Sequence, residues 1–311
     1  MKNYTTIKDI SNLSETIKEA ILLKMNPFEY STLGQHKTLV MLFFNSSLRT
    51  RLSTEKAAKN LGMDVMILNI NDAWNLEFED GTIMNTNSSE HIKEVAQVIA
   101  QYADMIAVRA FPTLKDKTKD ESEFIINSFK KYATVPIVNM ESSTAHPLQA
   151  LADAITISEL TEKKTPKVVL SWAPHPKALP QAVANSFVEM MQNLDVDFSI
   201  THPEGYELNS EITKNTSINY NQKEALKDAD FVYVKNWSSY NDYGKILSQD
   251  ENWMMTKEKL GKAKFMHCLP VRRNVVVEDA VLDSDQSVVI QQANNRTFAA
   301  QVVLKQLLEN L

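Results

Sequence analysis

The sequence contains a single cysteine, Cys268, so an intrachain disulfide is impossible. This excludes a small secreted scaffold that depends on disulfides. The six glycines are widely spaced, and no two of them form part of a dinucleotide-binding or P-loop motif. Any phosphate that binds here must therefore be held by something other than a glycine-rich loop.

Metal-ligand and membrane signals are also missing. The six histidines form no His-Glu-x-x-His pair or Cys/His cluster, so we expect no metal and no cofactor. The first residues are polar and form no apolar signal core. The most apolar early run, 39–44, is too short to cross a bilayer. We therefore expect a cytoplasmic protein with no membrane partner.

The charge balance argues against nucleic-acid partners. The chain has 33 basic and 39 acidic residues, which gives a net charge of -6 and no overall positive field to attract phosphate backbones. A local basic cluster can still hold a small anion. With 311 residues, the chain is longer than one hydrophobic core usually supports, and two domains are expected.

Short apolar or β-branched runs alternate with longer amphipathic stretches, which is typical of a parallel α/β fold. The predicted strands are 38–44, 64–68, 105–108, 136–139, 167–171, 197–201, 231–234, 264–267 and 287–290. Predicted helices include 49–61, 90–102 and 295–311. Runs 38–44 and 167–171 each lead into a polar segment and a helix, as opening strands of doubly wound units do.

The fold class predicted from this pattern is α/β, with two doubly wound parallel-sheet domains. We expect one domain at 1–145, with the final helix 295–311 returning to it, and the other at 146–294. Ligands of such folds bind at the carboxyl ends of the strands. Three polar segments of the sequence lie at predicted strand ends and are candidates for a site.

The first segment runs from Asn45 to Arg51 and opens a helix. Hydroxyl groups of Ser47 and Thr50, unpaired helix N–H groups and two arginines suit an anion. Taken alone, the segment is equally well explained as a capped helix with two surface arginines. The second segment, 141–153, contains His146 before a proline, which holds the histidine extended and away from the helix.

The third segment is His267-Cys268-Leu269-Pro270, followed by an arginine pair, Arg272 and Arg273. Cys268 has no neighbouring base to activate it, so it is best explained as a small buried hydrophobe. We expect Leu269-Pro270 to form an extended turn whose carbonyls face a ligand amine. The arginine pair is either an exposed basic patch or an anion clamp.

Together, Ser47-Leu48-Arg49-Thr50-Arg51, His146-Pro147-Leu148-Gln149 and His267-Cys268-Leu269-Pro270 resemble the transcarbamylase family in order and spacing. The resemblance implies a domain for carbamoyl phosphate, a domain for the amino acid, and a homotrimer with active sites shared between subunits. The implied carbamoyl phosphate residues are Ser47, Leu48, Arg49, Thr50, Trp74, Arg109, His146, Pro147, Leu148, Gln149, Cys268, Leu269 and Arg296. Those implied in catalysis are Arg49, Thr50, Arg109, His146, Gln149 and Cys268.

The amine acceptor is suggested by Lys235, which stands where ornithine enzymes carry an acidic residue. A lysine repels an α-ammonium group and suits a carboxylate, so we expect an ornithine with an acylated α-nitrogen. Trp172 to Lys177, Asp72-Ala73-Trp74 and Glu141 resemble the acylornithine branch of the family. That resemblance implies an acylornithine site formed by Glu141, His175, Lys235, Arg272 and Ser89.

The acyl group is predicted to be succinyl, with acetyl as the alternative. By resemblance, acetyl enzymes carry a glutamate near position 89, and succinyl enzymes carry a proline there. Ser89 matches neither, but it removes a charge that would repel a succinyl carboxylate. The predicted reaction is transfer of the carbamoyl group to N-succinylornithine in arginine biosynthesis. A non-catalytic ligand-binding relative and a Rossmann dehydrogenase are less favoured alternatives.

Overall fold

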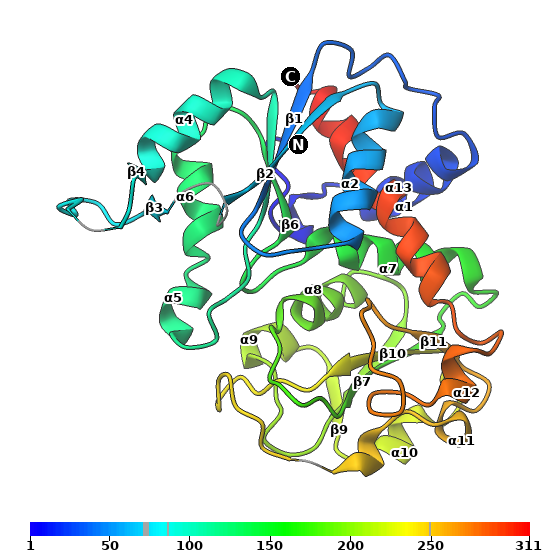
Figure 1. Cartoon of the computed structure of the whole chain (residues 1–311). Coiled ribbons are helices and arrows are strands. Elements are labelled where there is room, and N and C mark those ends of the chain that lie inside the picture. Colours follow the sequence, from blue (N-terminus) through cyan, green and yellow to red (C-terminus); the bar gives the residue numbers. More distant parts are fainter. Residues whose placement is uncertain (71–74, 86, 249) are drawn as a thin grey trace. The chain divides into compact units, whose positions relative to one another are not determined.

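The structure is a computed structural model that describes residues 1–70, 75–85, 87–248 and 250–311. It divides into two compact units, each built around its own parallel sheet (Figure 1). The first unit comprises Met1–Leu148 and Arg296–Leu311, and the second unit comprises Gln149–Asn295. None of the helices in these described ranges is long and apolar enough to span a membrane.

The sheet of the first unit has four parallel strands in the order β2-β1-β5-β6. These strands are β1 (Thr38–Phe43), β2 (Asp64–Asn69), β5 (Met105–Arg109) and β6 (Ile137–Glu141), and a separate parallel pair is formed by β3 (Leu76–Glu77) and β4 (Glu90–His91). Burial of 39–43 and of all of β5 explains their continuous apolar runs, because helices cover both faces of the sheet.

The helical segments of the first unit are η1 (Ile7–Asp9), α1 (Leu13–Met25), α2 (Arg49–Asn60), α4 (Ile92–Tyr102), α5 (Lys117–Glu121) and α6 (Phe124–Tyr132). Helices α4 and α6 cover one face of the sheet, while α2 lies on the other (Figure 1). On the α4 face, Val95, Ile99 and Phe129 pack against Val40 and Ile106 of the strands. The 3–4 residue spacing of the apolar positions in α4 produces this buried stripe.

The second unit has a five-stranded parallel sheet in the order β11-β10-β7-β8-β9. Its strands are β7 (Lys167–Ala173), β8 (Asp197–Thr201), β9 (Ser217–Asn219), β10 (Phe231–Asn236) and β11 (Lys264–Met266). Its helical segments are α8 (Ala182–Met191), α9 (Ser210–Thr213), α10 (Gln222–Leu226), η2 (Glu251–Trp253), α11 (Lys257–Leu260) and α12 (Asp279–Leu282). Two further helices, α7 (Pro147–Leu160) and α13 (Val289–Leu308), carry the chain from one unit into the other.

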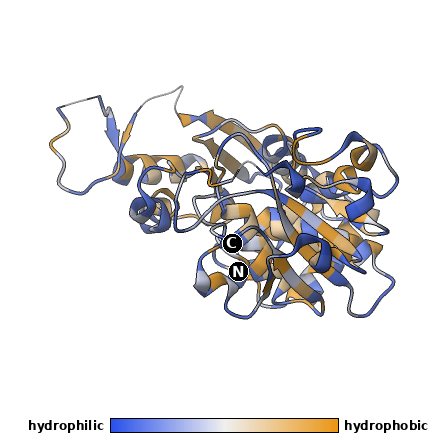
Figure 2. Cartoon of the chain, turned by 90° about the horizontal axis from the view of Figure 1, so that it is seen from below, coloured by the Kyte–Doolittle hydropathy of each residue, from blue (hydrophilic) through white to orange (hydrophobic). Residues whose placement is uncertain are grey.

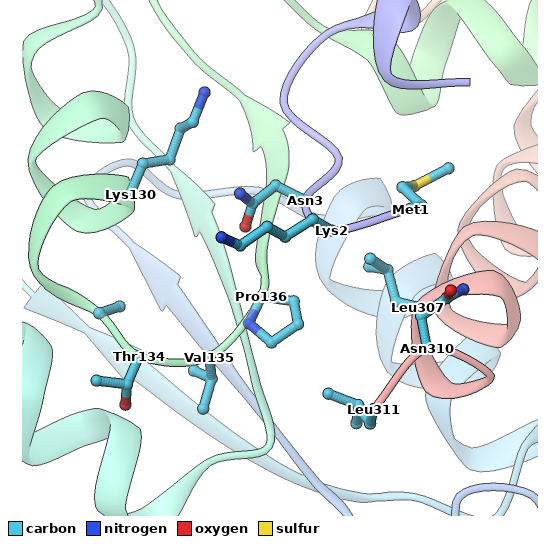
Figure 3. A pocket seen from close by; sticks show the side chains of 11 residues that line it. Met1, Lys2, Asn3, Lys130, Thr134, Val135, Pro136, Leu307, Asn310 and Leu311 are labelled. Carbon is cyan, nitrogen blue, oxygen red and sulfur yellow. The ribbon is translucent and has the colours of Figure 1, made fainter. Parts of the chain in front are cut away.

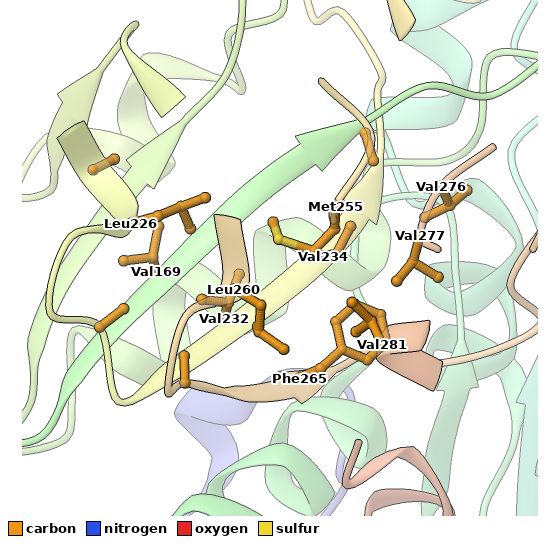
Figure 4. Packing of buried hydrophobic residues seen from close by; sticks show 14 of the residues in the cluster. Val169, Leu226, Val232, Val234, Met255, Leu260, Phe265, Val276, Val277 and Val281 are labelled. Carbon is orange, nitrogen blue, oxygen red and sulfur yellow. The ribbon is translucent and has the colours of Figure 1, made fainter. Parts of the chain in front are cut away.

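One part of the core of the second unit lies between its sheet and the short helices α10 to α12, and Phe187 of α8 stacks on Tyr233 of β10 in another part. Val169, Val232 and Phe265 of the strands pack with Leu260 and Val281 of the helices (Figure 4). Figure 2 shows the strands of the sheets largely in hydrophobic colours, with hydrophilic colours along the outer helices and loops. Burial on both faces is the reason that β7 and β10 are recognisable in the sequence.

The opening strand of each sheet is fixed at its start by an aspartate. In the first unit, Asp104 accepts the Thr38 backbone N–H at 2.8 Å and donates its own N–H to the Thr38 carbonyl at 2.9 Å. In the second unit, Asp230 makes the same two bonds with Lys167, at 2.8 and 2.9 Å. The two sheets therefore repeat one arrangement: the opening strand lies between its successor and the strand that follows the aspartate.

The predicted strand at 287–290 is wrong. Ser287 makes only an isolated bridge to Phe265, and the chain then enters α13 at Val289, six residues before the predicted start at 295. Val288 and Val289 are both buried whereas Ile290 is 74% exposed, which does not fit the alternation of a strand. The short polar strand β9 was not predicted, because it has no apolar run.

Candidate active site

In the first unit, the segment after β1 turns directly into α2, as the sequence predicted. Ser47 Oγ accepts a hydrogen bond from the Thr50 backbone N–H at 3.2 Å and satisfies one N–H of the first helical turn. The guanidinium of Arg51 lies over the Phe43 ring, 4.6 Å from its centroid. Arg49 makes no hydrogen bond or salt bridge within the described chain, so its charge is available to a ligand.

Thr50 connects two arginines that are far apart in the sequence. Its buried Oγ1 accepts from Arg109 Nη1 at 2.9 Å and from Arg296 Nη2 at 2.6 Å. Arg109 ends β5, which pairs with β1, and Arg296 lies in α13. The structure therefore brings together three residues predicted to bind carbamoyl phosphate.

Glu141, at the end of β6, extends this cluster. Its Oε2 lies 2.7 Å from Arg109 Nη1 and 3.5 Å from His146 Nε2. Arg109, Arg296, Glu141 and His146 are all at most 7% exposed. With Arg49, the group holds three guanidinium charges against one carboxylate, so it carries two net positive charges when His146 is neutral. Such a group suits a dianionic phosphate.

The loop before His146 is held by a residue that the sequence analysis missed. The carboxylate of Glu123 accepts from Ser142 Oγ at 2.7 Å, from the Thr144 N–H at 2.8 Å and from the Ser143 N–H at 3.3 Å. Glu123 lies in a polar stretch with no local pattern that distinguishes it from its acidic neighbours. Its contacts fix the path of the backbone toward His146.

In the second unit, Arg272, Lys235 and Lys177 lie close enough to His175 for their charges to act on it. His175 follows β7, and Lys235 lies near the end of β10. Arg272 Nε donates to His175 Nε2 at 3.2 Å, and His175 Nδ1 lies 2.7 Å from the Lys177 carbonyl oxygen and 3.1 Å from the Lys177 backbone nitrogen. Burial lowers the pKa of His175, and the charges of Arg272, Lys235 and Lys177 lower it further. The side chains form a positively charged group around a neutral imidazole.

Lys235 is the most informative member of this group. It lies near the end of β10, is 7% exposed, and has no hydrogen-bond or salt-bridge partner in the part of the chain that the structure describes. The stem of Lys235 is buried and its ammonium is not engaged by an acidic side chain of the described residues, so the charge is available to an anion. The carboxylate of a ligand would supply the missing partner.

The arginine pair after the third motif separates into two environments. Arg273 binds Asp279 at 2.8 Å and Asp283 at 2.7 Å, and these carboxylates raise its pKa. It is therefore a structural residue of the second unit. Arg272 instead contacts His175, which places it in the basic group.

The third motif forms a turn, but the predicted extended conformation of Leu269 is wrong. Leu269 has a φ of 57°, and its peptide bond to Pro270 is cis. Its backbone N–H donates to His267 Nδ1 at 2.8 Å, and this local bond defines the turn. Cys268 is half-buried rather than fully buried. Gln149, also in the second unit, donates from Nε2 to Asp153 Oδ1 at 2.7 Å.

The other predicted site residues have less distinctive surroundings. Leu48 is 67% exposed, and Pro147 and Leu148 lie buried in the first turn of α7. Ser89 is exposed and donates its N–H to the Asn75 carbonyl at 2.9 Å, next to β4. Trp74 lies outside the described residues. Glu141, which was predicted to bind acylornithine, contacts Arg109 and His146 of the phosphate group.

A pocket of about 810 Å³ lies elsewhere in the first unit, beside both chain ends (Figure 3). Lys2, Lys130 and Leu307 are among its lining residues, and none of the predicted site residues lines it. It therefore adds nothing to the candidate site.

Sequence comparison identifies the family. Residues 2–159 match the family described as "Aspartate/ornithine carbamoyltransferase, carbamoyl-P binding domain", and residues 180–307 match its "Asp/Orn binding domain". The chain belongs to the aspartate/ornithine carbamoyltransferase family. The predicted family and fold class are thereby confirmed, and the chain is a carbamoyltransferase.

Among the relatives of this carbamoyltransferase are enzymes for two acylated ornithines. It is 50% identical to the N-succinylornithine carbamoyltransferase of Bacteroides thetaiotaomicron, and the match covers 100% of both chains. It is 36% identical to the N-acetylornithine carbamoyltransferase of Xylella fastidiosa, with 93% of this chain and 94% of that protein covered.

Solved structures of an acylornithine carbamoyltransferase also resemble this chain. The N-acetyl-L-ornithine transcarbamylase matches with a TM-score of 0.90 and 33% identity, over 99% of this chain and 100% of the other. A variant of that enzyme with one glutamate replaced by serine was solved with carbamyl phosphate and N-succinyl-L-norvaline. It matches with a TM-score of 0.93 and 34% identity, over the same shares of the two chains.

Proposed function

We propose that this carbamoyltransferase transfers the carbamoyl group of carbamoyl phosphate to the side-chain amine of N-succinylornithine, in arginine biosynthesis. The products are N-succinylcitrulline and phosphate. The observation that carries the choice of acceptor is the ammonium of Lys235, which has no hydrogen-bond or salt-bridge partner among the described residues and acts on His175 together with Arg272. N-acetylornithine is the alternative acceptor, which the more distant relatives named above use.

The basic group of the second unit favours an acylated acceptor over free ornithine. Free ornithine carries an α-ammonium, which Lys235 and Arg272 would repel. Acylation turns that nitrogen into a neutral amide and leaves the α-carboxylate as the charge to be matched. N-succinylornithine carries a second carboxylate, so it also uses more of the positive charge around His175.

The succinyl group is further supported by Ser89 and by the relatives. By family resemblance, a glutamate near this position marks the acetyl enzymes, and it would repel a succinyl carboxylate. The acetyl enzyme with one glutamate changed to serine was solved with an N-succinyl ligand. The relative from Bacteroides thetaiotaomicron at 50% identity is an N-succinylornithine enzyme.

The first unit supplies the groups for the phosphoryl end of the reaction. We assign phosphate binding to Ser47, Arg49, Thr50 and Arg296, and polarisation of the carbamoyl carbonyl to Arg109 and His146. The neutral amine attacks the carbonyl carbon, the carbon–oxygen bond to phosphate breaks, and the departing phosphate accepts the proton from nitrogen. Guanidinium groups that are already fixed by Thr50 and Glu141 stabilise the developing negative charge without reorganising.

A parallel assay tests the acceptor. Citrulline-type product should form with carbamoyl phosphate and N-succinylornithine, at a kcat/KM well above that for N-acetylornithine, and free ornithine should be the poorest substrate. Preference for free ornithine would overturn the argument from Lys235. Preference for the acetyl compound would overturn only the succinyl assignment.

We also propose that the enzyme is cytoplasmic and works as a homotrimer whose subunits share active sites, with Trp74 reaching a neighbouring subunit. The family resemblance supports this assembly. Sedimentation equilibrium of the purified protein should give about three times the monomer mass of 35.3 kDa. A monomer that is fully active would contradict the shared site.

A further inference from the structure

A buried carboxylate in the second unit connects two predicted parts of the active site. Asp153 is fully buried in α7, one helical turn after Gln149. Its Oδ1 accepts two hydrogen bonds, from Gln149 Nε2 and from Gln292 Nε2, each at 2.7 Å. Both glutamines are 1% exposed. Asp153 thus joins α7 to the first turn of α13 through two bonds that are shielded from bulk solvent.

These bonds determine which way the two side-chain amides face. Asp153 Oδ1 can only accept, so each glutamine must turn its nitrogen toward it and its oxygen away. Gln292 is fixed twice, because its Oε1 accepts the His267 backbone N–H at 3.0 Å. A reversed amide would place two acceptors together at Asp153 and two donors together at His267, which costs both hydrogen bonds.

The same chain of bonds reaches the loop of the third motif. His267 is held through its N–H by Gln292, and its ring accepts the Leu269 N–H at 2.8 Å. The protonated ring nitrogen, Nε2, faces Asn236 Oδ1 at 3.4 Å. The position of the Cys268–Leu269 backbone therefore depends on Asp153 through Gln292 and His267.

We infer that Asp153 is a positioning residue for carbamoyl transfer. It acts through Gln149 and through the Gln292–His267 link, and the inference rests on the function proposed above. It presents the carbonyl oxygen of Gln149 to the NH₂ group of the carbamoyl moiety, and it holds the Cys268 and Leu269 carbonyls in place. Asp153 itself touches no substrate.

This role predicts a specific loss of discrimination. Acetyl phosphate resembles carbamoyl phosphate in shape but has a methyl group where the NH₂ group stands, so it cannot donate to Gln149. Replacing Asp153 by leucine removes the acceptor that fixes the orientation of the Gln149 amide. Binding of carbamoyl phosphate should then weaken about tenfold, while binding of acetyl phosphate changes less than about twofold.

Asp153→Asn is the matched conservative variant. Its side-chain oxygen can still accept from both glutamines, because rotating its nitrogen into that place would bring donors together. It should keep the wild-type ratio of carbamoyl to acetyl phosphate dissociation constants to within about threefold. Equal weakening of both ligands in Asp153→Leu would mean a merely structural role and would overturn the inference.

A second pair of variants tests the link to the loop and does not depend on how Asp153→Leu folds. Gln292→Leu removes the bonds to both Asp153 and His267. The control is Gln291→Leu, since Gln291 is the adjacent residue and also donates to a carboxylate of α7, Glu159, at 3.0 Å. Gln292→Leu should lower kcat about 10- to 100-fold, whereas Gln291→Leu should stay within about twofold.

The outcomes separate this inference from the proposed function. If the wild-type enzyme fails to bind carbamoyl phosphate, the proposed function is wrong. If the wild type binds and turns over but Gln292→Leu and Gln291→Leu lower kcat equally, only the positioning role fails. Calorimetric titration with carbamoyl and acetyl phosphate, and steady-state kinetics with N-succinylornithine, provide both readouts.

Discussion

Replacing Lys235 by methionine should weaken acceptor binding and leave the stability of the free enzyme nearly unchanged. Methionine has a similar length and keeps the packing of this residue, which is 7% exposed, but it removes an ammonium that has no hydrogen-bond or salt-bridge partner among the described residues. The free protein loses no hydrogen bond or salt bridge among the described residues, so its Tm should change little. The acylated ornithine loses the cation that its carboxylate would face.

The size of the effect follows from the burial of Lys235. Two unit charges about 4 Å apart attract by about 4 kcal/mol at an effective dielectric constant of about 20. Desolvation of the ligand carboxylate offsets part of this, which leaves a net loss of about 2–3 kcal/mol, or about 30- to 160-fold in affinity. Lys177 also acts on His175 but is exposed, so solvent should limit its contribution to less than about fivefold.

Lys177→Met is therefore the matched control. Both variants are titrated with N-succinyl-L-norvaline in the presence of saturating carbamoyl phosphate, so that binding is measured without turnover. Melting curves of the free proteins are recorded alongside. An equal or larger loss of affinity in Lys177→Met would refute the reasoning, as would a fall in both affinity and Tm for Lys235→Met, which indicates misfolding.

Three further predictions concern other parts of the site. Arg272→Ala should raise the KM for N-succinylornithine more than tenfold, whereas Arg273→Ala should mainly lower Tm. Steady-state kinetics and melting curves distinguish these outcomes, and reversed effects would contradict the assignment of Arg272 to the site and of Arg273 to the structure. Ser89→Glu should depress turnover of N-succinylornithine far more than that of N-acetylornithine, and equal losses in parallel assays would exclude position 89 as the acyl selector. In the free enzyme, the pKa of His175 lies below its usual value. A bound dicarboxylate should raise this pKa, because the ligand opposes the charges of Arg272 and Lys235. An unchanged or lowered pKa in an NMR titration would count against an acceptor site beside His175.

The sequence was sufficient for the features that depend on local pattern. Continuous apolar runs predicted eight of the nine strands in the two main sheets, and three short motifs in order predicted the family. The features that were missed depend on partners distant in the sequence. Glu123 binds a loop about 20 residues away, and Asp153 meets Gln292 from another helix, so neither contact leaves a trace in the local sequence.

Arg272 and Arg273 illustrate the same limit at the site itself. The sequence presented them as an undivided pair, which was interpreted as either a surface patch or an anion clamp. Their separation depends on where Asp279, Asp283 and His175 lie after folding. The left-handed φ of Leu269 was likewise unforeseen, because it depends on the position of the His267 ring.

The repeated order of the two sheets has a consequence for how the site is assembled. Strands β1, β5 and β6 of the first unit correspond to β7, β10 and β11 of the second, with Asp104 and Asp230 as matching reference points. The three motifs, Arg109, His175 and Lys235 each follow one of these six strands or lie at its end. One three-strand arrangement thus occurs twice along the chain, and in the proposed function the first copy serves the anionic leaving group and the second the carboxylate-bearing acceptor. Substitutions at the strand ends of the second unit can then change which acceptor is bound, while the residues that bind carbamoyl phosphate in the first unit stay the same.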